Sequence, residues 1–210
     1  MLLDIPFFAN TNEGNQCMQV AMQTAIRYFL DKEYSLEELD ALTGRKKGKW
    51  TWTQQVVSVL YDVGLEVKYF SKAETKNFLQ GEEYIRKEYG KDAETIIKMT
   101  DFPVLISAIQ KLQKSKLYER KILTLGQIEK HIKERHIPLI LVDYNILYKK
   151  KGQYLGHFVA VTGFDKEDIY YHEPGPHNPT PYKRAKKEMF MNAWNSKSTD
   201  NDIIIVFGKR

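Results

Sequence analysis

The segment that most constrains the fold of this chain is an apolar helix that begins near its only cysteine, Cys17. Two adjoining apolar stripes follow at helical spacing, one through Met22, Ala25, Ile26, Phe29 and Leu30, the other through Val20, Ala21, Thr24 and Tyr28. A helix that is apolar over so much of its surface must be buried, so we expect it at the centre of the fold. The Asn/Gly-rich loop before it ends at Asn15, a favoured N-cap type, which predicts Cys17 near the second helical position. There the unpaired backbone N–H groups and the helix dipole favour a thiolate.

The segments after this helix alternate between helix and strand signals. Ser35-Leu-Glu-Glu38 is a capping-box pattern that predicts a short helix ending at Gly44. A further helix is expected to stop near Gly64, and residues 65–70 alternate weakly as in a strand. Residues 72–135 are charged and mostly helical in pattern, and we interpret them as an insertion or lid. The histidines near the end of the last of these helices, His131 and His136, are expected to complement its C-terminus.

From Pro138 onward the pattern changes to short apolar runs typical of strands, at 139–144, 156–164, 168–172 and 203–207, with a helix at 187–194. The prolines and glycine between 174 and 181 predict an irregular segment without a strand ladder. Helices packed on an antiparallel sheet make an α+β fold, and 210 residues fit a single domain, 1–210, with 72–135 as the helical insertion.

The composition excludes several classes of protein. A single cysteine allows no intrachain disulfide and no CxxC motif, so nothing requires an oxidising compartment. The first eight residues lack the basic start of a signal peptide, and the longest apolar runs are far shorter than the ~20 residues of a membrane helix. We therefore expect a soluble, cytoplasmic protein with no membrane partner. The net charge of +5 mainly favours solubility.

A cysteine nucleophile needs a base, and His157 is the best of the five histidines. It follows Gly156 at the entrance of an apolar strand, 140 residues after Cys17. Glu173 ends the next strand and would orient the imidazole. A two-residue turn at 166–167 would place Glu173 opposite Ala160, on the face away from His157. This assignment therefore requires a longer loop or a β-bulge that shifts the pairing by one residue.

Four segments, in this order and spacing, resemble the C39-like branch of the papain-like cysteine peptidases: Ile5-Pro-Phe-Phe-Ala-Asn10, Cys17-Met-Gln-Val-Ala21, Gly156-His-Phe-Val-Ala-Val-Thr-Gly163 and His172-Glu-Pro-Gly175. The resemblance covers roughly residues 1–65 and 137–207. It implies a papain-like α+β fold in which a helix carrying Cys17 packs on an antiparallel sheet carrying His157 and Glu173. It also implies acyl transfer without a cofactor, by default hydrolysis of a peptide or other amide substrate.

The chain departs from this branch at two places. Glu173 stands where the branch usually has an aspartate before the proline. The glutamine that the branch commonly places about six residues before the cysteine is missing, and the stretch offers Asn10 and Thr11 instead. We expect Asn10 to be the oxyanion donor beside the Cys17 backbone N–H, with Gln16 as the second candidate.

The tryptophans at 50 and 52 add a candidate substrate contact. Side chains at i and i+2 of a helix point to different sides, so one tryptophan would pack inward while the other lines a cleft. We assign the cleft position to Trp52.

Other uses of the same residues stay open. A catalytically silent C39-like binding module would keep the fold without turnover, as the changed residues around Cys17 permit. A zinc site formed by Cys17, His157, His172 and His177 uses proper ligand types, although the spacings match no compact metal motif. Nucleic-acid binding is not expected, because solvated loop charge explains the short basic clusters.

Overall fold

The fold is built on one mixed sheet, seen in a computed structural model that describes residues 1–10 and 15–210. The described strands lie in the order β2-β1-β7-β3-β4-β5-β6, and only the β1–β2 pair is parallel. Their bounds are β1 (Leu65–Ser71), β2 (Tyr118–Arg120), β3 (Ile137–Asp143), β4 (Gly156–Phe164), β5 (Asp168–Glu173), β6 (Thr180–Lys186) and β7 (Ile203–Lys209). The predicted α+β class is confirmed.

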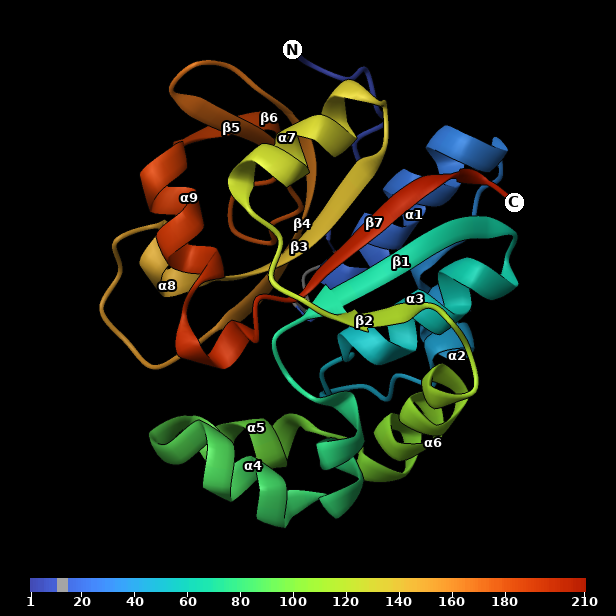
Figure 1. The fold of residues 1–210 in the computed structure, drawn as a ribbon, viewed down its shortest axis with the longest axis vertical. Coiled ribbons are helices and arrows are strands. Elements are labelled where there is room, and N and C mark those ends of the chain that lie inside the picture. The colour runs from blue at the N-terminus through green and yellow to red at the C-terminus, as the bar shows by residue number, and fades with distance from the viewer. Residues whose placement is uncertain (11–14) are drawn as a thin grey trace.

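Helices cover both faces of the sheet (Figure 1). The first group is α1 (Cys17–Leu30), α2 (Leu36–Thr43) and α3 (Thr53–Asp62), with α1 packed on β4 and β7 and α3 on β1. The second is α7 (Leu125–Lys133), α8 (Tyr144–Leu147) and α9 (Lys187–Trp194), with α7 packed on β3 and β4 and α9 on β3 and β6. Met22, Ala25 and Ile26 of α1 have no exposed surface, so this helix is central, as its two apolar stripes predict.

Part of the region 72–135 builds a second, smaller core. The 3-10 helix η1 (Thr75–Gln80), α4 (Glu82–Tyr89), α5 (Ala93–Met99) and α6 (Phe102–Gln113) bury Phe78, Ile85 and Leu105 together. A further 3-10 turn, η2 (Gly90–Asp92), links α4 to α5. The same region supplies β2, so it is not purely helical. Its role as an insertion or lid stays a prediction.

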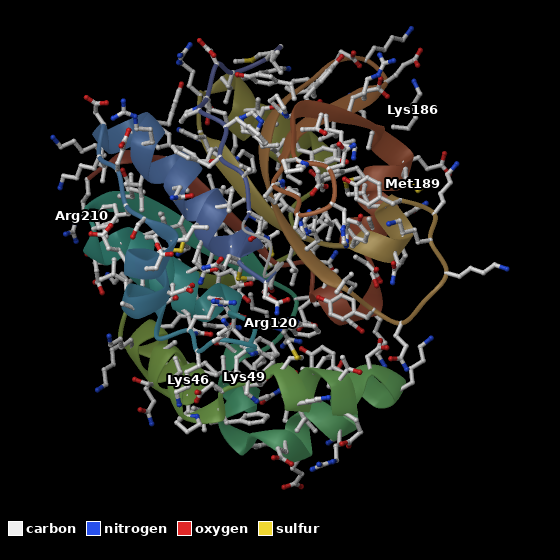
Figure 2. The ribbon with its side chains drawn as sticks, turned by 180° about the vertical axis from the view of Figure 1, so that it is seen from behind. Lys46, Lys49, Arg120, Lys186, Met189 and Arg210 are labelled. Carbon is white, nitrogen blue, oxygen red and sulfur yellow. The ribbon has the colours of Figure 1, made fainter. Side chains whose placement is uncertain are left out.

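Two lysines attach this helical region to the segment that precedes α3. Lys49 Nζ donates to the Lys98 carbonyl at 2.6 Å, and Lys46 Nζ lies 2.7 Å from a carboxylate oxygen of Asp101. Both lysines lie beside the green helices in Figure 2. Part of the basic charge in this loop is therefore used in contacts within the chain.

The pairing of β4 with β5 contains the irregularity that the sequence argument required. Near the turn, Phe164 pairs with Ile169 and Gly163 with Tyr170, which is the register of a two-residue turn. The register then shifts between Val161 and Gly163, so that Ala160 pairs with His172. Paired residues point to the same face of a sheet and successive residues to opposite faces. His172 therefore shares the face of Ala160, and Glu173 lies on the opposite face, together with His157.

The bulge is covered by the first residues of the chain. Leu3 N donates to the Thr162 carbonyl at 2.7 Å, and Leu2 forms an isolated bridge with Gly163. A Cβ on Gly163 would lie 2.4 Å from the Met1 carbonyl oxygen, so only glycine fits against this arm. The N-terminal arm and the hairpin register are therefore coupled.

The expectation of an irregular segment through Pro181 is wrong at its end, since β6 starts at Thr180 and contains Pro181. The strand is the outer edge of the sheet, and its register with β5 is disturbed between Tyr171 and Glu173. Edge strands and bulges are the places where proline is tolerated, because no ladder hydrogen bond is lost there. Among the described residues, no helix is long and apolar enough to cross a membrane.

Candidate active site

Cys17 is the first residue of α1, one position earlier than the sequence predicts. The N-cap is Gln16, not Asn15, and its side chain makes no capping hydrogen bond. The expected Asn/Gly-rich loop falls largely on residues 11–14, including Thr11, and lies outside the described residues. At the first helical position the Cys17 backbone N–H has no acceptor within the helix, so it is geometrically suited to bind an anionic oxygen.

His157 lies between Cys17 and Glu173 and is almost completely buried. Its Nε2 is 2.8 Å from Glu173 Oε1, and its side chain also hydrogen-bonds with Cys17. Burial alone would lower the pKa of His157, but the hydrogen bonds with Cys17 and Glu173 raise it to about 9. A protonated imidazole is therefore stable between the thiol and the carboxylate.

Glu173 is held by donors on both carboxylate oxygens. The Gly175 backbone N–H donates to Oε1 at 3.0 Å, and the Tyr148 hydroxyl donates to Oε2. Burial would raise the pKa of Glu173, but the hydrogen bonds from His157, Tyr148 and Gly175 together lower it below its ordinary value. An ionised carboxylate only accepts hydrogen bonds, so His157 Nε2 carries the proton and Nδ1 is the ring nitrogen suited to face Cys17.

Tyr148 contacts Glu173 and was missed by sequence reasoning. Its hydroxyl also lies 2.9 Å from that of Tyr171, so the two rings form a polar chain behind Glu173. The residue follows α8 directly and lies outside the four motif segments. A tyrosine there carries no local signal of its role, because its partner is 25 residues away on another strand.

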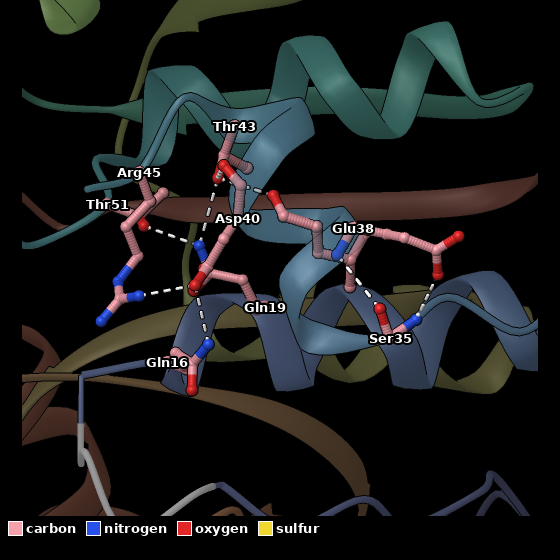
Figure 3. Close-up of polar contacts among 9 residues, drawn as sticks. Gln16, Gln19, Ser35, Glu38, Asp40, Thr43, Arg45 and Thr51 are labelled. Carbon is pink, nitrogen blue, oxygen red and sulfur yellow. Dashed lines mark hydrogen bonds and ion pairs between the residues drawn. The ribbon is translucent and has the colours of Figure 1, made fainter. Parts of the chain in front are cut away.

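The two candidate oxyanion donors differ in their surroundings. Gln16 Nε2 donates to Asp40 Oδ2 at 2.8 Å, which directs its amide toward α2 (Figure 3). Asn10 is held by its backbone N–H, which donates to the Pro174 carbonyl at 2.7 Å, beside Glu173. Its side-chain amide is buried and has no hydrogen-bond partner within the described chain. Asn10 is the one with an amide available, although it does not line the cavity described next.

Gln19 helps to hold the start of α1. Its Nε2 donates to the hydroxyl oxygens of Thr51 at 2.8 Å and Thr43 at 3.2 Å, and Figure 3 shows this amide between them. Thr43 belongs to α2 and Thr51 to the segment before α3, so one buried side chain ties both to the helix that carries Cys17.

A cavity of about 440 Å³ opens onto Cys17, His157 and Glu173. Trp50 and Trp52 both line it, and both precede α3, which starts at Thr53. Trp52 is anchored by its indole N–H, which donates to the Thr100 hydroxyl at 3.1 Å. The structure therefore places the predicted substrate contact in the cavity wall together with its neighbour.

Two buried aspartates, Asp200 and Asp202, also line this cavity and were not singled out from the sequence. Asp202 accepts a hydrogen bond from Tyr69 at 2.7 Å, and Asp200 accepts one from Tyr89. Burial and the charge of Asp202 raise the pKa of Asp200 to about 7, and burial raises that of Asp202 to about 6. The cavity thus has a thiol and imidazole in one part and a titratable acid pair in another.

The alternative zinc set is not assembled among the described residues. His172 Nε2 lies 3.1 Å from the Ile5 carbonyl, and its Nδ1 accepts from the Tyr182 backbone N–H at 3.2 Å. Both ring nitrogens are therefore used by the backbone, away from Cys17. The group of side chains in the described chain that could hold a metal ion is a different one, His131, Glu134 and His136.

Two solved structures are similar to this chain in fold. The peptidase domain of Streptococcus ComA, a bifunctional ABC transporter, aligns with a TM-score of 0.52 and 15% identity over 96% of this chain and 97% of that one. A putative C39-like peptidase from Bacillus anthracis aligns with a TM-score of 0.59 and 11% identity over 100% and 98%. The predicted C39-like, papain-like fold is confirmed by these similarities.

A comparison with curated proteins gave no match. A family model described as guanylylate cyclase matches residues 12–206. This range includes Cys17, His157 and Glu173 and the whole region 72–135. The matched range covers most of the sequence, and on that basis this chain belongs to the guanylylate cyclase family.

Proposed function

We propose that this protein is a cysteine-dependent acyl-transfer enzyme, and that its default reaction is hydrolysis of a peptide or other amide bond. The observation that supports this most directly is the buried Cys17–His157–Glu173 relay at the wall of a substrate-sized cavity. A buried histidine whose pKa is raised, with a thiol and an ionised carboxylate as its two partners, is the arrangement that activates a sulfur nucleophile.

In the proposed reaction, the Cys17 sulfur attacks the substrate carbonyl carbon and its proton is held by His157. His157 then donates that proton to the leaving amine, which departs and leaves a thioester on Cys17. Water attacks the thioester after giving a proton to His157, and the acid product and the thiol are released. Glu173 stays ionised and keeps Nε2 protonated, so that Nδ1 faces the sulfur throughout.

The oxyanion formed in both steps needs hydrogen-bond donors. The Cys17 backbone N–H at the start of a 14-residue helix is the first, because helix geometry leaves it unpaired and the dipole favours negative charge there. We propose the Asn10 amide as the second donor, because this buried side chain has no hydrogen-bond partner among residues 1–10 and 15–210. Gln16 is less suited, because its amide is engaged by Asp40.

The family name makes cyclisation of a guanine nucleotide the competing activity. A cyclase joins two groups of its own substrate and needs no nucleophile from the protein, so Cys17 would have no chemical role in it. Replacing Cys17 by serine therefore separates the two activities. Amide hydrolysis should fall by several orders of magnitude, whereas a cyclase reaction would be unchanged.

The first experiment is alkylation of the thiol by iodoacetamide between pH 5 and 10. Cys17 is the only cysteine, so incorporation measured by mass spectrometry reports on it alone. We expect fast alkylation near pH 6 in the wild-type protein and slow alkylation at that pH in His157→Ala. Glu167→Gln removes an exposed carboxylate from the β4–β5 turn and serves as the control. An ordinary thiol profile in the wild-type protein would favour the catalytically silent binding module instead.

The second experiment screens a mixed peptide library for cleavage, with Cys17→Ala as the blank. Products that form with the wild-type protein and not with Cys17→Ala would identify the scissile bond. Cleavage that persists in Cys17→Ala would refute the proposed nucleophile.

A further inference from the structure

We propose that His131, Glu134 and His136 form a binding site for one zinc-like transition-metal ion, separate from the Cys17 cavity. One nitrogen from each histidine and one carboxylate oxygen of Glu134 all lie within 4.8 Å of one another. None of the three residues lines the cavity. The inference does not depend on the proposed acyl-transfer activity.

The backbone at the end of α7 brings the two histidines together. His131 is in the last turn of α7, Glu134 is the C-cap, and Arg135 adopts a left-handed conformation with φ 65°. That turn lets the His136 backbone N–H donate to the His131 carbonyl at 3.0 Å. The chain therefore reverses over the helix end, and His136 meets His131 immediately before β3 begins.

The donor atoms already have a spacing suited to a tetrahedral ion. The Nδ1 atoms of His131 and His136 are 3.1 Å apart, and Glu134 Oε2 is 3.6 Å from His136 Nδ1. With zinc–nitrogen bonds of about 2.0–2.1 Å, two tetrahedral ligands stand roughly 3.3 Å apart. Both separations lie within about 0.3 Å of this value, and the Glu134 carboxylate is within 4.8 Å of both rings, so a rotation of this exposed side chain would close the site around one ion, with water as the fourth ligand.

The rings are held in place by packing on the sheet. Phe207 of β7 meets the His136 ring edge to face at 4.9 Å between centroids and the His131 ring at 5.7 Å. Both rings are only partly exposed, so their Nδ1 atoms are preorganised while the Glu134 carboxylate stays accessible. Preorganised imidazoles lose little conformational freedom when they bind a metal.

A neighbouring cation limits the affinity of the site. Lys130 Nζ lies 3.8 Å from Glu134 Oε1 and repels a bound metal ion, so we expect moderate affinity.

The ligand set determines which ions fit. Two imidazoles and one carboxylate suit zinc, nickel or copper, whereas magnesium and calcium prefer shells made of oxygen. A bound ion would join the end of α7 to the start of β3. β3 pairs with β4, which carries His157. Its expected effect is on stability, not on chemistry at Cys17.

The test is isothermal titration calorimetry of the untagged chain, residues 1–210, with zinc chloride, repeated with magnesium chloride. The variants are His136→Asn, which removes one ligand, and Cys17→Ser, which removes the thiol that would compete for zinc. We expect one zinc per chain in the wild-type protein and in Cys17→Ser, with at least about tenfold weaker binding in His136→Asn. Zinc should also raise the melting temperature of Cys17→Ser and leave that of His136→Asn unchanged.

Two outcomes would overturn the proposal. The first is zinc binding that persists in His136→Asn and disappears in Cys17→Ser, which would place the ion at the thiol and imidazole of the cavity. The second is the absence of stoichiometric zinc binding in Cys17→Ser. Circular dichroism of His136→Asn without metal checks that a loss of binding does not come from unfolding.

Discussion

Replacing Glu173 by glutamine should lower the pKa of His157 by about one to two pH units. The two side chains have the same size, so the change removes the charge 2.8 Å from His157 Nε2 while the shape is kept. The wild-type pKa of about 9 lies roughly 2.5 pH units above the ordinary value of 6.5, which corresponds to about 3–4 kcal/mol at about 1.4 kcal/mol per unit. Cys17 and Glu173 both contribute, and a close opposite charge is typically worth 1–3 units.

The assay is an NMR titration of the five histidine rings, with His157 assigned from the signal missing in His157→Asn. At pH 8 about nine tenths of the wild-type imidazole should be protonated, against between a tenth and a half in Glu173→Gln if its pKa falls to about 7–8. Glu167→Gln, which removes an exposed carboxylate, should leave the titration unchanged. Equal His157 midpoints in the wild-type protein and Glu173→Gln would refute the claim that this carboxylate sustains the charged imidazole.

The same pair makes a prediction about stability with a definite sign. The folded pKa of His157 is raised, so its contribution is fully present below pH 6.5 and is lost as the pH rises through about 9. Glu173→Gln should therefore lower the free energy of unfolding, relative to the wild-type protein, by more at pH 6.5 than at pH 10. Urea denaturation at the two pH values measures this difference. A loss that is the same at both pH values would indicate that only packing or neutral hydrogen bonds were disturbed.

Two further substitutions test the arm and the acid pair. Gly163→Ala should lower the free energy of unfolding by about 1–3 kcal/mol, because the new Cβ would lie 2.4 Å from the Met1 carbonyl, whereas Gly126→Ala meets nothing within 4 Å and should be neutral or stabilising. Equal urea midpoints for the two variants would show that the arm does not constrain the bulge. Asp202→Asn should raise the free energy of unfolding by about 1–3 kcal/mol at pH 8 and change it little at pH 4. The reason is that the pKa of Asp202 is raised in the folded state, so its carboxylate destabilises the folded protein increasingly as the pH rises from about 4 through 6. A gain that does not grow between these two pH values, in urea denaturation, would contradict the assignment of a buried charge.

Local signals in the sequence determine much of the fold. The apolar stripes after Cys17 predict a buried helix, and α1 is buried on most of its faces. The Ser35 capping box and the left-handed Gly44 C-cap bound α2 as predicted, because caps depend on residues only three or four positions apart. The apolar runs at 156–164 and 203–207 lie in strands, and so does the run at 139–144 except for Tyr144, which begins α8.

The sequence also indicates which residues form the candidate site, but not the contacts that hold it. Cys17, His157 and Glu173 could be named from order and spacing. Tyr148 and the aspartates at 200 and 202 could not, since their partners lie on other elements. The donors on Glu173 and the acid pair in the cavity are visible only once those elements are packed together.

The register of β4 and β5 shows where the limit lies. From the turn alone, Glu173 faces away from His157, and the sequence shows only that some irregularity must correct this. In the tertiary structure this irregularity is a β-bulge at Thr162. The backbone N–H of Leu3, more than 150 positions earlier in the chain, donates a hydrogen bond to the Thr162 carbonyl. Helix and strand periodicities come from neighbouring residues and can be read locally, whereas a bulge is selected by the segment that packs on it. The sequence therefore determined most of the elements and the reactive groups, and tertiary packing decided that the carboxylate and the imidazole face each other.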